Sequence, residues 1–264
     1  MWKRNRIDKV RIEKENKQRE DLKSILATAR RIIKNTDKYE ETHPIYLLIK
    51  HLVDQELYNN IYRSISTHNP NKVKFFALQD LLPCQNDGDK GVFFLKNNDN
   101  KYLYKDDFDN FISYEKFIDE TKIVGKVATI NLGFDPVLTR PWNEKRLVNA
   151  FSNIGRGKRG GEWKEDGNHK AQLWLPFGIT FVSSGNHSIT AGILNNEGQL
   201  KINSIYDMSK IFPHIYCDGV NYFRKRDDSL YAPVRNFSLA VVFEIGRLIN
   251  EQRYSGNSIQ FKKL

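Results

Sequence analysis

The sequence predicts an α+β protein, and three observations indicate this class. Apolar residues recur at helical spacing within the first 70 residues, short apolar runs then alternate with turn-rich segments, and strand-like and helix-like segments alternate from there onward. We expect a basic helical region over residues 1–70, an insert of a β-hairpin and a helix over 71–121, and a mixed α/β unit with a C-terminal helix over 122–264. The chain is 39% hydrophobic, which suffices for a packed core.

Two helices are predicted in the N-terminal region. The first is apolar on one side from Leu22 to Ile33, and the mostly charged twenty residues before it are expected to form a frayed or partner-dependent extension. The second runs from about Pro44 to Ser64, because proline suits the first turn of a helix. We expect the two helices to pair as a hairpin.

The positive charge of the chain is concentrated in the first of these helices. Residues 1–35 hold twelve Lys or Arg against five Asp or Glu, which accounts for most of the formal net charge of +10. A basic helix of this kind can lie along nucleic acid or an acidic partner. It can equally be a solvated lysine-rich helix, and both interpretations stay open.

The sequence offers no sign of a membrane segment or of a metal site built from cysteines. No run approaches the roughly 18 apolar residues of a membrane span, and the charged start lacks the apolar core of a signal peptide. We therefore expect a cytoplasmic protein without a membrane partner. Cys84 and Cys217 do not have metal-ligand spacing and are expected to be free thiols, with Cys217 a small buried hydrophobe.

The middle of the chain predicts a hairpin and a short helix. Apolar runs at 92–95 and 102–104 flank a polar turn at 97–100, and a helix is expected through Phe108, Phe111, Ile112 and Tyr114. Further on, we expect a strand at 126–130, a helix after Pro141 and an apolar strand region at 172–182. A helix from Ile189 that ends at 195–198, strands at 201–206 and 215–216, and an amphipathic helix at 237–252 complete the pattern. Glu244 and Arg247 on that last helix are expected to form a surface pair.

The strongest local motif is the turn Gly185-Asn186-His187-Ser188 between a strand and a helix. Peptide N–H groups at a helix start are unsatisfied, the helix dipole adds positive charge, and glycine lets a phosphate approach the backbone. We therefore assign Gly185, Asn186 and Ser188 to a phosphate site. Asn186 or Ser188 could instead only cap the helix, and it is His187 that favours a function here.

This turn, the run 173–179 before it and the helix start Arg140-Pro141-Trp142-Asn143 resemble the ParB/sulfiredoxin superfamily. More narrowly, residues 142–218 resemble an uncharacterised bacterial family of unknown function that is met around phages and mobile elements. The resemblance implies a ParB/sulfiredoxin-like fold and the binding of a nucleotide or nucleic acid.

Carried over residue by residue, Gly185 matches the turn glycine of the superfamily and His187 the histidine of the sulfiredoxin-type turn. Asn186 stands where sulfiredoxin has its reactive cysteine, so reduction of a sulfinic acid is not expected. Ser188 stands where the superfamily usually has an arginine that grips phosphate. Another cation must therefore substitute, or no phosphate binds.

Several cations are candidates for that substitution. They are Arg140, Arg146 and three residues of the glycine-rich loop 155–161, namely Arg156, Lys158 and Arg159. Four glycines make this loop flexible enough to wrap a phosphate, although the spacing of a P-loop is missing. The same composition is typical of a solvated surface loop, so both interpretations remain.

A catalytic set is also conceivable, because Asp166 and His169 lie three residues apart before the strand that leads to His187. Each imidazole can transfer a proton near neutral pH and a carboxylate can orient it, with Asn168 beside the phosphate. This combination predicts hydrolysis of a phosphodiester, and the same residues could hold a divalent metal ion. An ordinary Asp-Gly-Asn turn with an incidental histidine is the simpler interpretation.

The sequence thus predicts a nucleotide- or nucleic-acid-binding protein, with phosphodiester hydrolysis at a His/Asp site as the sharper form, and leaves open whether the protein is an enzyme. The alternative is a phage or mobile-element protein that docks on a host or phage protein in defence or counter-defence. His43, His51, His68 and His214 have no predicted partner or role.

Overall fold

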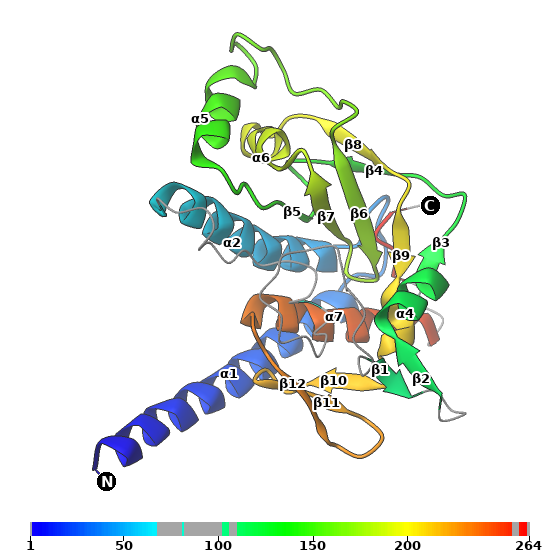
Figure 1. Cartoon of the computed structure of the whole chain (residues 1–264). Coiled ribbons are helices and arrows are strands. Elements are labelled where there is room, and N and C mark those ends of the chain that lie inside the picture. The colour runs from blue at the N-terminus through cyan, green and yellow to red at the C-terminus, as the bar shows by residue number, and fades with distance from the viewer. Residues whose placement is uncertain (1, 68–80, 82–101, 106–109, 255–258, 263–264) are drawn as a thin grey trace.

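The computed structural model describes residues 2–67, 81, 102–105, 110–254 and 259–262 (Figure 1). Its helices and strands form a mixed α+β architecture, which confirms the predicted fold class. The expected strand at 92–95, its turn, Phe108 and Cys84 lie outside the described residues. Within the described ranges, no helix is both long and apolar enough to cross a membrane.

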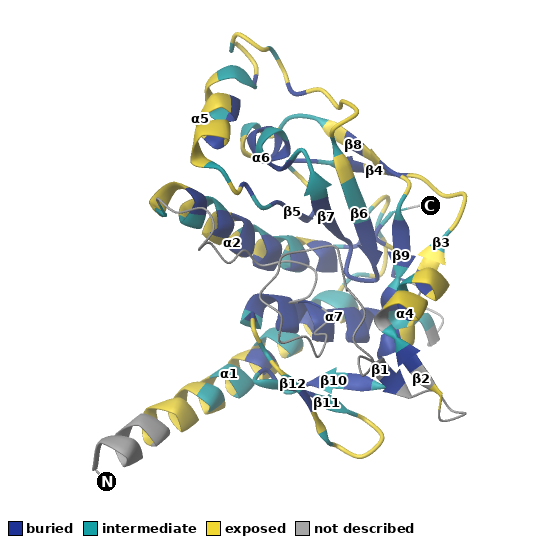
Figure 2. Ribbon diagram, in the orientation of Figure 1, coloured by how far each residue is buried: buried dark blue, intermediate teal, exposed yellow. Residues whose placement is uncertain are grey.

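Three helices form one layer of the molecule: α1 (Trp2–Lys34), α2 (Ile45–Ser66) and α7 (Phe237–Tyr254). The expected hairpin of the first two helices is completed by α7, which packs against both. α1 is one continuous helix whose amino-terminal half projects away from the other elements (Figures 1 and 2). It docks from Arg19 onward, where the Nε of Arg19 lies 2.8 Å from the Oδ2 of Asp218.

The prediction that the last helix is amphipathic is wrong, because α7 is buried on every side. All residues from 238 to 250 are buried between α1, α2 and the strand β10 (Figure 2). Glu244 and Arg247 accordingly form a buried ion pair at 2.8 Å and not a surface pair. Glu244 also accepts a hydrogen bond from the N–H of Cys217 at 2.7 Å, and Arg247 donates to the carbonyl of Phe212 at 2.7 Å, so the pair anchors β10 to α7.

A five-stranded mixed sheet faces this helical layer, in the order β3-β9-β6-β7-β5. Its strands are β3 (Lys122–Ile123), β5 (Val137–Leu138), β6 (Lys170–Leu175), β7 (Ile179–Ser184) and β9 (Ile205–Asp207). β6 and β7 are an antiparallel hairpin, whereas β5 pairs with β7 and β9 with β6 in parallel. A separate ladder joins β4 (Ala128–Asn131) to β8 (Gln199–Ile202), and α5 (Glu144–Asn153) packs on α6 (Asn186–Asn195).

Two smaller β units lie on the side of α7 away from β5, β6 and β7 (Figure 1). One consists of β10 (Ile215–Cys217), β11 (Asn221–Arg224) and β12 (Leu230–Pro233), preceded by the 3-10 helix η2 (Met208–Ile211). The other pairs β1 (Tyr102–Lys105) with β2 (Phe111–Ser113), ahead of α4 (Tyr114–Thr121). The prediction of a helix through Phe111 and Ile112 is therefore wrong, because these residues belong to β2. The helix begins only at Tyr114, where the Ser113 hydroxyl caps it by accepting a hydrogen bond from the N–H of Lys116.

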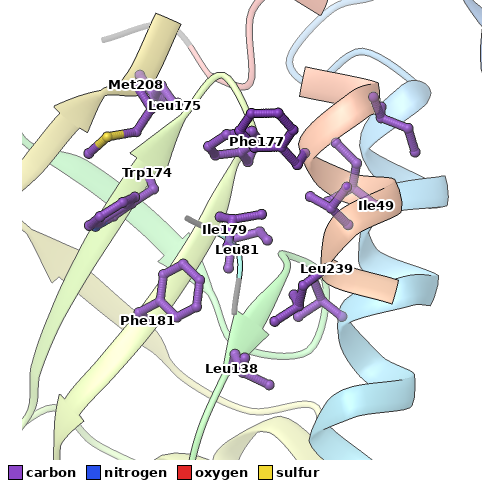
Figure 3. Packing of buried hydrophobic residues seen from close by; sticks show 14 of the residues in the cluster. Ile49, Leu81, Leu138, Trp174, Leu175, Phe177, Ile179, Phe181, Met208 and Leu239 are labelled. Carbon is purple, nitrogen blue, oxygen red and sulfur yellow. The ribbon is translucent and has the colours of Figure 1, made fainter. Parts of the chain in front are cut away.

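The core lies between the β6–β7 hairpin and the helices. Figure 3 shows Trp174, Phe177 and Ile179 of the hairpin region opposite Ile49 of α2 and Leu239 of α7. These side chains are almost fully buried, so the apolar run predicted over 172–182 holds the sheet against the helical layer. The outer end of β7 is thereby fixed, and it leads directly into the turn at Gly185.

Candidate phosphate-binding site

The turn between β7 and α6 has the backbone geometry that its glycine predicts. Gly185 is the N-cap of α6 and has a φ of 79°, in the left-handed region that glycine adopts without strain. No side chain among the described residues caps this helix start. The first N–H groups of α6 have no acceptor within the helix. Gly185, His187 and Ser188 are all half-buried, so solvent reaches the turn.

Asn186 holds the turn to the chain that precedes α5. Its buried Oδ1 accepts a hydrogen bond from the N–H of Arg140 at 2.7 Å, and its carbonyl accepts from the Thr190 hydroxyl at 2.6 Å. The Asn186 side chain is therefore used to position the backbone. The structure places Arg140 beside the turn through its main chain.

His187 belongs to an exposed group at the start of α5. The N–H of Asn143 donates to its Nε2 at 3.1 Å, which ties the first turns of α5 and α6 together. The edge of its ring meets Trp142 at a centroid distance of 5.5 Å, and the Arg146 guanidinium lies over the same indole at 5.0 Å. Burial and then the charge of Arg146 lower the pKa of His187, so its ring is neutral at pH 7 with the proton on Nδ1.

His169 belongs to a second, buried group beneath the turn. Its Nδ1 accepts from the N–H of Asp166 at 2.8 Å, and its Nε2 lies 3.1 Å from the Ser188 hydroxyl, which also accepts from the Trp163 indole at 3.0 Å. The imidazole stacks on Trp163 at 4.7 Å and its side chain is only 2% exposed. Burial lowers the pKa of His169, so the neutral ring donates from Nε2 to Ser188 and both nitrogens are used.

The three residues assigned to catalysis are thus divided between two hydrogen-bonded groups. Asp166 lies near His169, with 3.5 Å between its Oδ1 and the imidazole Nδ1. Because that nitrogen already accepts from the peptide N–H, the carboxylate does not orient the ring; it accepts from the N–H of Asn168 at 2.8 Å instead. His187 shares its hydrogen bond with Asn143 and takes no part in this group.

The glycine-rich loop is fixed by its own hydrogen bonds. Peptide groups close it from Gly155 to Gly161 at 2.8 Å, and the Lys158 ammonium donates to the carbonyl of Phe151 at 2.7 Å at the end of α5. The Arg156 guanidinium pairs with Glu162 at 2.8 Å. Of the three cations of the loop, the exposed Arg159 is the one without a partner in the described part of the chain. The loop therefore has a defined conformation instead of the flexible one that its composition suggests.

The chain matches one known protein family along most of its length. Residues 7–256 match the model of a family of unknown function, DUF6710. The chain belongs to this family. The match extends from α1 to α7 and so covers far more than the segment 142–218. No curated protein and no solved structure matches the chain. The resemblance to the ParB/sulfiredoxin superfamily remains a prediction.

Sequence reasoning missed the two tryptophans that distinguish the groups around the turn. Trp142 is 46% exposed and Trp163 is 5% exposed, and each one contacts a histidine. Both precede or follow polar, turn-rich sequence, so no periodicity signals which of them is buried. Within the described residues, no group of three or more His, Cys, Asp or Glu side chains is arranged to hold a metal ion.

Proposed function

We propose that this protein binds a phosphate group of a nucleotide or nucleic acid at the first turn of α6, with a base stacked on Trp142. The observation that carries the proposal is the exposed Trp142, which contacts both Arg146 and His187 beside an uncapped helix start. An exposed indole stacks on bases of any sequence, and an arginine beside it adds a charge for phosphate. The proposal places this activity in the cytoplasm.

The hydrogen-bond pattern supports binding more than hydrolysis. A general base needs a free lone pair within reach of the proton that it removes. His169 uses both nitrogens within its buried group, and the Nε2 lone pair of His187 accepts from Asn143. In their neutral forms, both imidazoles therefore have their lone pairs occupied. This arrangement favours positioning of the turn over proton transfer.

Binding of fluorescently labelled single-stranded DNA, single-stranded RNA and ATP to the full chain tests the proposal. Trp142→Ala is expected to weaken binding about tenfold, because loss of one base stack costs roughly 1–3 kcal/mol. Arg146→Ala is expected to weaken binding because it removes the cation for phosphate. Lys122→Ala, an exposed cation on β3, is the matched control and should keep the affinity of the unmodified chain. Affinity for nucleic acid should also fall as salt rises.

Two results would contradict the proposal. One is equal binding by the Trp142→Ala and Lys122→Ala variants. The other is the absence of binding to all three probes, which would favour the alternative of a protein that docks on a host or phage protein.

A further inference from the structure

A cavity lies at the carboxyl-terminal ends of α1 and α7, where the segment 36–43 crosses between α1 and α2. Its volume is about 690 Å³, within the range of small-molecule sites. It shares no residue with the turn at Gly185. Among its lining residues, Ile33, Leu248 and Ile259 supply an apolar surface.

His43 is the polar residue of the buried part of this cavity. Only 2% of it is exposed, and its Nδ1 accepts from the N–H of Ile45 at 3.0 Å. Its ring meets Tyr39 edge-on at 5.0 Å. Burial lowers the pKa of His43, so the neutral ring carries its proton on Nε2. No described residue accepts a hydrogen bond from that N–H, so it is available to a ligand in the cavity.

The exposed part of the cavity carries charges of both signs on different elements. Arg30 and Lys34 come from α1, Glu251 comes from α7, and Asp37 lies on the segment between α1 and α2. None of the salt bridges among the described residues involves these four side chains, although the charge of Glu251 acts on the pKa of the nearby Lys225. Two cations and two carboxylates match a ligand that carries both charges better than they match a phosphate.

We propose that this cavity binds a small zwitterion of the amino-acid class. Its carboxylate pairs with Arg30 and Lys34, and its ammonium group pairs with Glu251. Its apolar side chain lies against Ile33, Leu248 and Ile259, and a polar atom at the end of that side chain accepts from the Nε2–H of His43.

Isothermal titration calorimetry of the full chain tests the ligand class with matched probes. L-Tyrosine has the head group, the apolar body and a terminal oxygen; L-phenylalanine lacks that oxygen, and tyramine lacks the carboxylate. We expect L-tyrosine to bind about tenfold more tightly than either relative, because each loses one hydrogen-bonded or charged contact. Tighter binding of AMP than of L-tyrosine would overturn the zwitterion assignment, and so would an absence of heat with L-tyrosine.

Substitutions test which residues of the cavity contact the ligand. Replacing both Arg30 and Lys34 by alanine should weaken L-tyrosine binding about tenfold, whereas Arg31→Ala, an exposed neighbour outside the cavity lining, should not change it. His43→Phe should abolish the preference for tyrosine over phenylalanine. Should His43→Phe fail to fold, the exposed double variant still decides: unchanged L-tyrosine binding in it overturns the proposal.

Discussion

Two tryptophan–histidine pairs flank the first turn of α6, and they differ in burial, ring geometry and hydrogen bonding. Trp163 and His169 are stacked, buried and hydrogen-bonded to Ser188, while Trp142 and His187 meet edge to face and the indole is 46% exposed. The first pair fills the space beneath the turn. The second presents an aromatic surface with Arg146 beside it. Burial and the neighbouring cation therefore distinguish a supporting histidine from one that can face a ligand.

The close approach of Gly185 to His169 of the buried pair gives the largest expected effect. A Cβ on Gly185 would lie 2.3 Å from the Cδ2 of His169, and φ is 79°. Gly185→Ala should therefore destabilise the protein by about 2–5 kcal/mol, from left-handed strain plus overpacking. Gly157→Ala is a matched control, with φ 77° and nothing within 4 Å, and should cost only about 1–2 kcal/mol. Urea unfolding measures both, and equal losses would show that His169 yields freely.

Substitutions of Ser188 and Trp142 should affect stability and ligand binding differently. The Ser188 hydroxyl accepts from the Trp163 indole and from the His169 imidazole, so Ser188→Ala leaves two donors of the buried group without an acceptor. We expect a loss of about 2 kcal/mol in the free energy of unfolding. Trp142→Ala should change stability by less than about 1 kcal/mol, because that indole is exposed, but should weaken ligand binding. The reverse pattern would exchange the roles of the two pairs.

The sequence predicts the elements around the turn well, because they follow from local rules. Glycine at φ 79° between a strand and a helix, and the helix ending at Asn196 with φ 57°, both reflect conformations that Gly and Asn tolerate. The apolar run expected over 172–182 lies in β6 and β7, but the turn at 176–178 that divides it into two strands is not among the predicted features. Local propensity therefore suffices to find the glycine turn that precedes α6.

The failures come from long-range packing. Glu244 and Arg247 look like a surface pair at three-residue spacing, and only α1, α2 and β10 around α7 make them a buried anchor. In the same way, Asp166 and His169 are close in sequence, but the peptide N–H that occupies the imidazole depends on the loop conformation. Residue spacing does not reveal which lone pairs the fold leaves free.

Acid should affect both pairs through their histidines. The pKa values of His169 and His187 are lowered in the folded protein from the ordinary value of about 6.5, so the unfolded chain binds more protons below that pH. The contribution of these two histidines to the free energy of unfolding should therefore be constant above about pH 7 and decrease as pH falls from there towards 5. His169→Gln and His187→Gln should each make this slope shallower in urea titrations at several pH values. An unchanged slope in His169→Gln would mean that folding does not shift the pKa of its imidazole.

The smallest expected effect concerns the cations of the loop 155–161. Lys158 donates to the carbonyl of Phe151 near the end of α5, a contact worth about 0.5–1 kcal/mol to stability. Lys158→Ala should therefore lower the unfolding free energy slightly and leave nucleic-acid affinity unchanged, since its ammonium group is already used. Arg159→Ala should leave stability unchanged, because that exposed side chain has no partner among the described residues. A loss of nucleic-acid affinity in Arg159→Ala but not in Lys158→Ala would extend the binding surface from Trp142 to the loop. A loss confined to Lys158→Ala would show that the hydrogen bond from Lys158 to the Phe151 carbonyl breaks when the ligand binds.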